Sequence, residues 1–140
     1  MPINADRWLF DTSAALAFVD EDSPFHRAVW NLGAATERGL AGHANVETYS
    51  VLTRLPLPKR LSARDAALLI STEFPSPRFL DPASAATLID EFANAGVVGG
   101  SVYDGLVGAC AREAGIPLLT CDSRAVPVYS VLGVPHTLVH

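Results

Sequence analysis

Apolar and polar residues alternate along this chain in short blocks that predict strands and helices in turn. The apolar runs Trp8–Phe10 and Ile116–Cys121 have the length of buried strands, whereas segments 45–55 and 101–114 carry apolar residues at helical spacing. This alternation is typical of an α/β fold with a mostly parallel sheet. We expect strands at about residues 8–10, 40–44, 78–80, 117–120 and 137–139.

Capping residues, prolines and glycines predict where the helices begin and end. Ser23 followed by Pro24 resembles a helix start with a stop at Gly39, and Ser62 with Asp65 has the spacing of a capping box. No repeat, linker or low-complexity tract interrupts the pattern, so we expect one domain over residues 1–140. The expected helices cover residues 12–19, 23–39, 45–55, 62–70, 81–95 and 101–114, with a last one ending at 133.

The composition favours a packed globule. The chain has 140 residues, of which 49% are hydrophobic, and no apolar stretch approaches the roughly 20 residues of a membrane helix. The first seven residues are polar and lack the apolar core of a signal peptide, so we expect a cytoplasmic protein without a membrane partner. A net charge of −5 disfavours non-specific binding of nucleic acid through a basic surface, but it does not exclude a nucleic-acid substrate.

Four carboxylates occupy positions from which they can reach one pocket. Asp11 and Asp122 close the two apolar runs, and Glu47 and Asp104 lie near the starts of two helical segments. Parallel strands end at one edge of a sheet, and the helices that follow them begin there. Each acid also has a structural alternative: Asp11 and Asp122 as caps, Glu47 as a charge near a helix start, and Asp104 as part of a capping box.

The convergence of four acids creates a charge conflict that a divalent cation resolves. The chain has one lysine, Lys59, and it lies in a proline-flanked connection far from these positions in the sequence. Mg²⁺ and Mn²⁺ are hard cations whose preferred ligands are carboxylates and water. A site of this kind suits hydrolysis of a nucleic-acid backbone, because the metal binds phosphodiester oxygens and activates water.

The same residues resemble the four motifs of PIN-domain ribonucleases, in the same order. The motifs are Trp-Leu-Phe-Asp11-Thr-Ser, Asn45-Val-Glu47-Thr, Ser101-Val-Tyr-Asp104-Gly-Leu-Val-Gly-Ala and Leu-Leu-Thr120-Cys-Asp122. Gly99-Gly100 and the ending Tyr129-Ser-Val-Leu-Gly-Val are similar to VapC-type toxins of bacterial toxin–antitoxin pairs. The resemblance covers essentially the whole chain.

The resemblance implies a three-layer α/β/α fold around a mainly parallel sheet of about five strands. It also implies an RNA-cutting enzyme whose site is formed by Asp11, Glu47, Asp104 and Asp122. We expect Asp11, Asp104 and Asp122 to hold Mg²⁺, or Mn²⁺, directly or through water, while Glu47 completes the shell or orients the attacking water. An antitoxin protein is expected to mask this site, and the toxin is expected to form a homodimer.

Supporting roles are assigned to three further residues. Ser13 and Thr120 resemble positions whose hydroxyl holds a metal-bound water or a neighbouring carboxylate, with helix capping and strand-end hydrogen bonding as the alternatives. Arg124 is the best candidate for phosphate contact. It is also the only basic residue between Asp122 and Val126-Pro127, where relatives often carry several.

Two other classes of function remain open at this point. One is a phosphohydrolase that works through an aspartyl-phosphate on Asp11, although Ser13 stands where that chemistry wants a second aspartate. The other is a phospho-receiver or similar non-catalytic binding module. Both want a lysine near the acidic pocket, and Lys59 is the only one in the chain.

Overall fold

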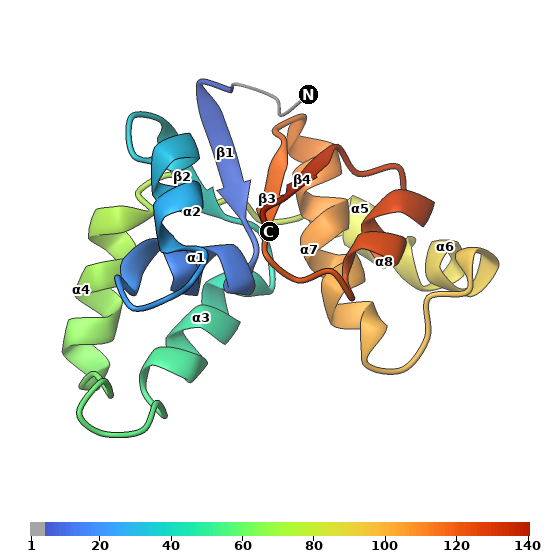
Figure 1. Ribbon diagram of the computed structural model, residues 1–140. Helices are drawn as coiled ribbons and strands as arrows, with labels where there is room; N and C mark the ends of the chain where they lie inside the picture. The colour runs from blue at the N-terminus through green and yellow to red at the C-terminus, as the bar shows by residue number, and fades with distance from the viewer. Residues whose placement is uncertain (1–4) are drawn as a thin grey trace.

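The computed structural model describes residues 5–140 and contains a four-stranded parallel sheet in the order β2-β1-β3-β4 (Figure 1). Every neighbouring pair of strands in the sheet is parallel. This confirms the α/β fold with a parallel sheet. The strands are β1 (Arg7–Phe10), β2 (Glu37–Leu40), β3 (Leu118–Thr120) and β4 (His136–Leu138).

The two central strands come from the two apolar runs of the sequence. Leu9 of β1 pairs with Leu118 of β3, and Phe10 pairs with Leu119. All four side chains are at most 1% exposed, as expected for strands covered on both faces. Both strands therefore end in the middle of the same edge of the sheet, where the backbone N–H of Asp11 donates to the carbonyl of Leu119 over 3.1 Å.

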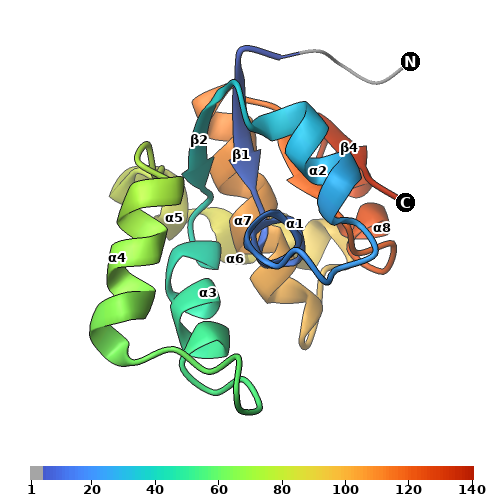
Figure 2. The same ribbon diagram turned by 60° about the vertical axis from the view of Figure 1, so that its left-hand side comes forward.

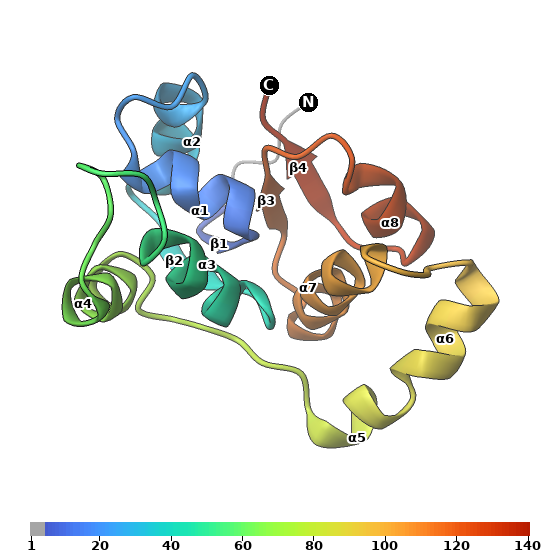
Figure 3. The same ribbon diagram turned by 90° about the horizontal axis from the view of Figure 1, so that it is seen from below.

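The helices form layers on the two sides of this sheet. Figure 3 shows α1 and α2 on one side, and α3, α4 and α7 on the other, with α5 and α6 farther out. Figure 2 shows α1 and α3 beginning below the carboxyl ends of β1 and β2. The helices are α1 (Thr12–Val19), α2 (His26–Gly33), α3 (Ala44–Leu52), α4 (Ala63–Glu73), α5 (Pro82–Ala86), α6 (Leu88–Ala95), α7 (Ser101–Ala114) and α8 (Val126–Val131).

An aromatic cluster anchors the α1 layer to the sheet. The ring of Phe10 lies 5.6 Å from that of Phe18 and 5.2 Å from that of Phe74, both edge to face. Each buried aromatic ring of this kind stabilises a fold by roughly 1.5–3 kcal/mol relative to an exposed one. The cluster fixes the position of α1, and with it the residues that follow β1.

The strand expected at residues 78–80 is reduced to a single bridge between Ala41 and Arg78, so the sheet has four strands instead of about five. The segment does run along β2, because the amides of Ser76 and Arg78 donate to carbonyls of Arg38 and Leu40. Pro75 and Pro77 lack the N–H that a longer ladder needs. The prolines thus limit the pairing at this edge.

The expectation of one helix over 23–39 followed by a strand over 40–44 was wrong. Helix α2 ends at Gly33, and β2 already begins at Glu37. Gly39 lies within this strand. The position requires glycine because a Cβ atom there would sit 1.8 Å from the backbone oxygen of Ser76. The guanidinium of Arg38 folds back onto the carbonyls of Gly33 and Ala34, which satisfies the end of α2 through a contact that local sequence patterns do not show.

The remaining helix limits differ by small shifts. The expected helix over 81–95 is divided at Thr87 into α5 and α6, α3 ends three residues early, and α4 runs three residues beyond 70. The capping role of Ser62 is confirmed, since its Oγ accepts from the amide of Asp65 at 3.1 Å. Within residues 5–140, no helix has the length and apolar character needed to span a membrane.

Candidate active site

A small pocket of about 50 Å³ lies at the carboxyl edge of the sheet, and all four predicted carboxylates line it. Asp11 follows β1, Asp122 follows β3, and Glu47 and Asp104 lie in the first turns of α3 and α7. The pocket has room for a cation with a few water ligands but not for a drug-sized molecule, which needs about 300 Å³ or more. Its remaining lining residues are Thr12, Ser13, His43, Tyr103 and Val107.

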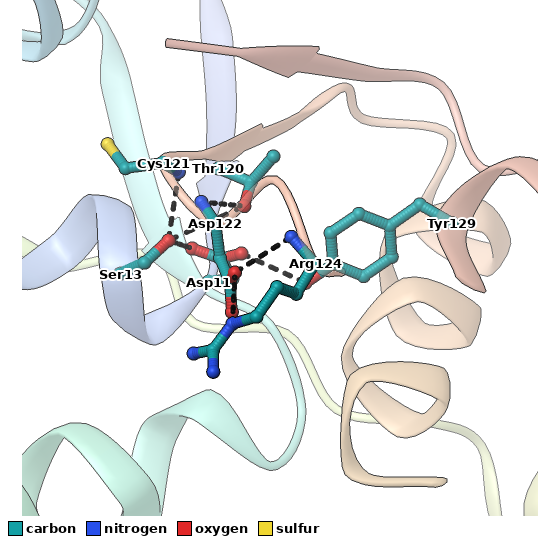
Figure 4. Close-up of polar contacts among 7 residues, drawn as sticks. All are labelled: Asp11, Ser13, Thr120, Cys121, Asp122, Arg124 and Tyr129. Atoms are coloured by element: carbon teal, nitrogen blue, oxygen red, sulfur yellow. Dashed lines mark hydrogen bonds and ion pairs between the residues drawn. The ribbon is translucent and has the colours of Figure 1, made fainter. Parts of the chain in front are cut away.

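Asp11 is buried and fixed by hydrogen bonds to both of its carboxylate oxygens (Figure 4). Its Oδ1 accepts from the Ser13 hydroxyl at 2.6 Å and from the Ala14 amide at 3.0 Å. Its Oδ2 accepts from the Tyr129 hydroxyl at 2.9 Å. Burial raises the pKa of Asp11 above its ordinary value, and these hydrogen bonds offset part of the rise.

The hydroxyls of Ser13 and Thr120 link the ends of the two central strands. Ser13 Oγ also accepts from the amide of Cys121 at 2.8 Å and lies 3.4 Å from Thr120 Oγ1. Since Ser13 uses its proton on Asp11, Thr120 is the donor in that contact. Thr120 Oγ1 in turn accepts from the amide of Asp122 at 3.0 Å. The two hydroxyls thereby tie Asp11 to the backbone that carries Asp122.

Asp122 is partly exposed and is turned toward its own chain. Its Oδ1 accepts from the backbone N–H of Arg124 at 2.9 Å and lies 3.3 Å from the guanidinium Nε (Figure 4). The Arg124 side chain is 91% exposed, so this ion pair is screened by water and contributes little to stability. Arg124 therefore places a positive charge at the mouth of the pocket.

Asp104 and Glu47 form the helix side of the pocket. Burial raises the pKa of Asp104 to about 6, and the negative charges of Asp122, Asp11 and Glu47 add to this effect. Glu47 Oε2 lies 3.9 Å from His43 Nε2, a contact that becomes an ion pair when the imidazole is protonated. The charges of the neighbouring acids therefore add to burial in the direction of the predicted charge conflict.

The donor set fits a hard divalent cation, although the side chains do not yet converge on one point. Among residues 5–140, no three acidic, histidine or cysteine side chains are arranged so that they could hold one metal ion. One oxygen of Asp122 contacts Arg124, and one oxygen of Glu47 lies near His43. Carboxylate oxygens in a pocket with excess negative charge are the ligands that Mg²⁺ and Mn²⁺ prefer.

The structural alternatives for the four acids are partly correct. Asp11 does cap α1, and Asp122 does accept from the backbone two residues on. Asp104 does not belong to a capping box, because the Ser101 hydroxyl bonds to the backbone of Val98 instead. Capping therefore accounts for Asp11 and Asp122. Glu47 lies in the first turn of α3, where a negative charge suits the helix dipole as its alternative expected, and Asp104 lines the pocket without a capping role.

Two basic residues lie outside the pocket in structural ion pairs. Arg112 forms a two-pronged ion pair with Glu91 at 2.6 and 2.8 Å. Lys59 Nζ lies 3.0 Å from carboxylate oxygens of both Asp20 and Asp22. The pocket thus has no lysine in its lining, which removes the group that an aspartyl-phosphate enzyme or a receiver module would need.

Three aromatic residues of the site were missed by sequence reasoning. Tyr129 was noticed only as part of a terminal motif, yet its buried hydroxyl holds Asp11. His43 lines the pocket together with Tyr103, and neither ring was assigned to the site from the sequence. The only local signal for Tyr129 was a tyrosine in an apolar segment seven residues after Asp122. Its contact with Asp11 spans 118 positions, so neighbours in the sequence do not reveal it.

The model of the PIN domain family matches residues 8–129, which include all four carboxylates of the pocket. The chain belongs to the PIN domain family. It is similar to Ribonuclease VapC27 of Mycobacterium tuberculosis (strain ATCC 25618 / H37Rv), with 41% identity over 129 residues that cover 92% of this chain and 93% of that protein. Ribonuclease VapC40 of the same strain is 45% identical over 121 residues, covering 80% and 90% of the two chains.

Solved structures show the same fold at low sequence identity. The chain superposes on a structure described as VapBC2 from Rickettsia felis bound to a DNA fragment from their promoter, with a TM-score of 0.68 and 9% identity over 96% of this chain and 99% of that chain. VapBC from Salmonella typhimurium, described as DNA bound, gives a TM-score of 0.66 at 16% identity, covering 94% and 96%. The solved structures confirm the fold, and the family model together with the two ribonucleases confirms the predicted resemblance and favours a nuclease over the two alternative classes.

Proposed function

We propose that this protein is a metal-dependent endoribonuclease and the toxin of a toxin–antitoxin pair. The observation that carries the proposal is the convergence of Asp11, Glu47, Asp104 and Asp122 on one pocket that has no lysine in its lining. The similarity to ribonucleases over nine-tenths of the chain supports the substrate class. PIN-domain ribonucleases are metal-dependent, in agreement with the excess negative charge of this pocket.

In this mechanism the chain supplies ligands, orientation and a path for RNA. Asp11, Asp104 and Asp122 would hold the cation, and Ser13 and Tyr129 fix the orientation of Asp11. Glu47 would complete the shell or orient the attacking water. A bound Mg²⁺ or Mn²⁺ ion would supply charge neutralisation for the phosphodiester and for the leaving oxygen.

A wider groove beside the pocket provides a place for the RNA strand. It has a volume of about 360 Å³ and shares Ser13 and Asp122 with the acidic pocket. Arg124 lines this groove and stands ready for a phosphate, since a guanidinium binds phosphate through paired donors. RNA lying in the groove therefore reaches the carboxylates next to a positive charge.

The protein partner that we propose is an antitoxin that masks this acidic pocket. Charge complementarity favours a basic segment that places an arginine among the four carboxylates. Two of the solved structures with this fold are VapBC complexes by their descriptions, which supports such an assembly for this chain. A homodimer in the cytoplasm is the proposed state of the free toxin.

Cleavage of total cellular RNA by the purified protein tests the proposal. We expect discrete fragments with Mg²⁺ or Mn²⁺, none with EDTA, and a loss of at least about a hundredfold in the Asp104→Asn variant. Asp90→Asn is the matched control, because Asp90 is an exposed acid on α6 outside the pocket. Cleavage that persists in EDTA, or equal cleavage by the two variants, would contradict the proposal.

A further inference from the structure

Two aromatic rings lie at the acidic pocket without a part in holding a metal. Tyr103, at the start of α7, and His43, directly before α3, both line the pocket. Their ring centroids are 4.9 Å apart with the planes 30° from parallel. Tyr103 is 51% exposed, so a large part of its side chain faces solvent, whereas aromatic side chains in proteins are mostly buried.

The charges around the pocket do not explain how an RNA strand is held there. The chain carries a net charge of −5, and four carboxylates line the pocket itself. In the part of the chain that the structure describes, Arg124 is the one arginine or lysine that lines either the pocket or the neighbouring groove. A bound cation offsets part of this charge, but affinity for the flanking nucleotides needs a contribution that does not depend on charge.

We propose that Tyr103 and His43 form a stacking platform for a base of single-stranded RNA beside the scissile phosphate. This inference rests on the proposed nuclease function and specifies how its substrate is held. Aromatic rings stack on unpaired bases of any sequence, because every base has a π-face. The exposed part of Tyr103 is the surface for the base, and the His43 ring packs against the Tyr103 ring.

The platform and the carboxylates are fixed to the same two helix starts. Tyr103 is adjacent in sequence to Asp104, and His43 precedes Glu47 by one helical turn, with Nε2 and Oε2 3.9 Å apart. A base stacked on these rings is therefore positioned relative to the carboxylates by rigid backbone. This coupling places the phosphate next to the stacked base at the pocket.

The test compares an RNA that has bases with one that lacks them. The probes are a fluorescent twelve-residue oligouridine and an abasic ribose–phosphate oligomer of equal length. Binding is measured by anisotropy in Mg²⁺ on the Asp104→Asn background, which prevents cleavage. We expect oligouridine to bind at least about tenfold more tightly than the abasic oligomer, as stacking on aromatic side chains predicts.

Variants of Tyr103 then locate the effect. We expect Tyr103→Leu to weaken oligouridine binding about tenfold and leave the abasic oligomer unchanged, while Tyr103→Phe preserves both affinities. Tyr49→Leu is the matched control, since Tyr49 is an exposed tyrosine like Tyr103 but lies on α3, outside the pocket. Circular dichroism of every variant checks that the fold is intact.

Any one of three results overturns the platform. The first is equal binding of the two oligomers, which includes no binding of either. The second is an equal loss of affinity for both oligomers in Tyr103→Leu, and the third is the same loss of oligouridine affinity in Tyr49→Leu. Because binding is measured without turnover, the outcome is separate from that of the cleavage assay. A protein that cleaves RNA but shows none of these differences keeps the nuclease and loses the platform. A protein that shows the differences without cleaving RNA keeps the platform as an RNA-binding site.

Discussion

The strand side of the acidic pocket holds Asp11 under three hydrogen bonds, whereas the helix side leaves the Asp104 carboxylate without a hydrogen bond from any described residue. Asp11 is 5% exposed and cannot change its rotamer without breaking contacts with Ser13 and Tyr129. Asp104 is partly exposed, and its pKa of about 6 is set by burial and by the three other acids.

This difference separates two tasks within one site. The strand side is preorganised, so it presents one ligand in a fixed place and needs no rearrangement when a cation arrives. The helix side is held under electrostatic strain, so it responds most to protons and to cations. Removing a fixed contact should therefore have the largest effect on the site, changing the protonation of Asp104 a smaller one, and changing the exposed charge of Arg124 the smallest.

The largest effect is expected from Tyr129→Phe, which removes one fixed contact and keeps the ring. We expect the affinity for Mn²⁺ to fall by about 10- to 100-fold, as for other residues that orient metal ligands. Calorimetric titration measures this without any RNA. Tyr49→Phe is the control for loss of a tyrosine hydroxyl on an exposed helix. An unchanged affinity in Tyr129→Phe would show that Ser13 and Ala14 alone suffice to orient Asp11.

The second prediction concerns pH, which acts on the helix side. Asp104 has a pKa of about 6, and it must lose its proton to bind a cation. Affinity for Mn²⁺ should therefore fall by about tenfold for each pH unit below 6, and change far less between pH 7 and 8. Titrations from pH 5 to 8 test this. A profile that stays flat down to pH 5 would contradict the raised pKa.

The third prediction is a gain in stability at neutral pH from Asp104→Asn. A carboxylate whose pKa is higher in the folded state than in the unfolded state loses stability as pH rises from about 4 to 6. Asparagine does not ionise, so the variant should be more stable on the order of 1 kcal/mol at pH 7.5 in EDTA, allowing for solvent screening. At pH 4 the gain should disappear. Urea unfolding at both pH values measures it, and an equal gain at both would contradict the electrostatic cause.

The smallest effect is expected from Arg124→Gln, which changes the exposed part of the strand side. Because the Arg124 side chain is 91% exposed, its pair with Asp122 contributes less than about 0.5 kcal/mol to stability. We expect an unchanged urea midpoint but weaker binding of oligouridine at low salt, with the difference fading as salt rises. A clear drop in stability would show that the pair is structural.

Sequence reasoning reached the carboxylates because their signal is local. Asp11 and Asp122 each end an apolar run, and parallel strands bring such ends to one edge of the sheet. Strands β1 and β3, which carry Asp11 and Asp122 at their ends, were placed correctly from apolar runs, and β4 was placed to within one residue. Periodicity and strand-end position are therefore sufficient for the fold class and for bringing the acids together.

Features that depend on contacts between distant segments escaped prediction. Gly39 resembled a helix stop, but it is glycine because the backbone of Ser76 passes directly over it. Tyr129 is buried by an apolar helix, and the partner of its hydroxyl lies 118 residues away. Neither fact follows from neighbours in the sequence, so both belong to the packing of segments that only the three-dimensional structure brings together.

The strand order has a consequence for synthesis of the chain. Strand β1 is made first, yet it pairs on one side with β3, which begins at Leu118, and the hydroxyl of Tyr129 reaches back to Asp11. Since chains emerge from the ribosome with the N-terminus leading, Asp11 is made long before the residues that complete its surroundings. The pocket therefore cannot assemble in a nascent chain until β3 and Tyr129 have been synthesised and have emerged.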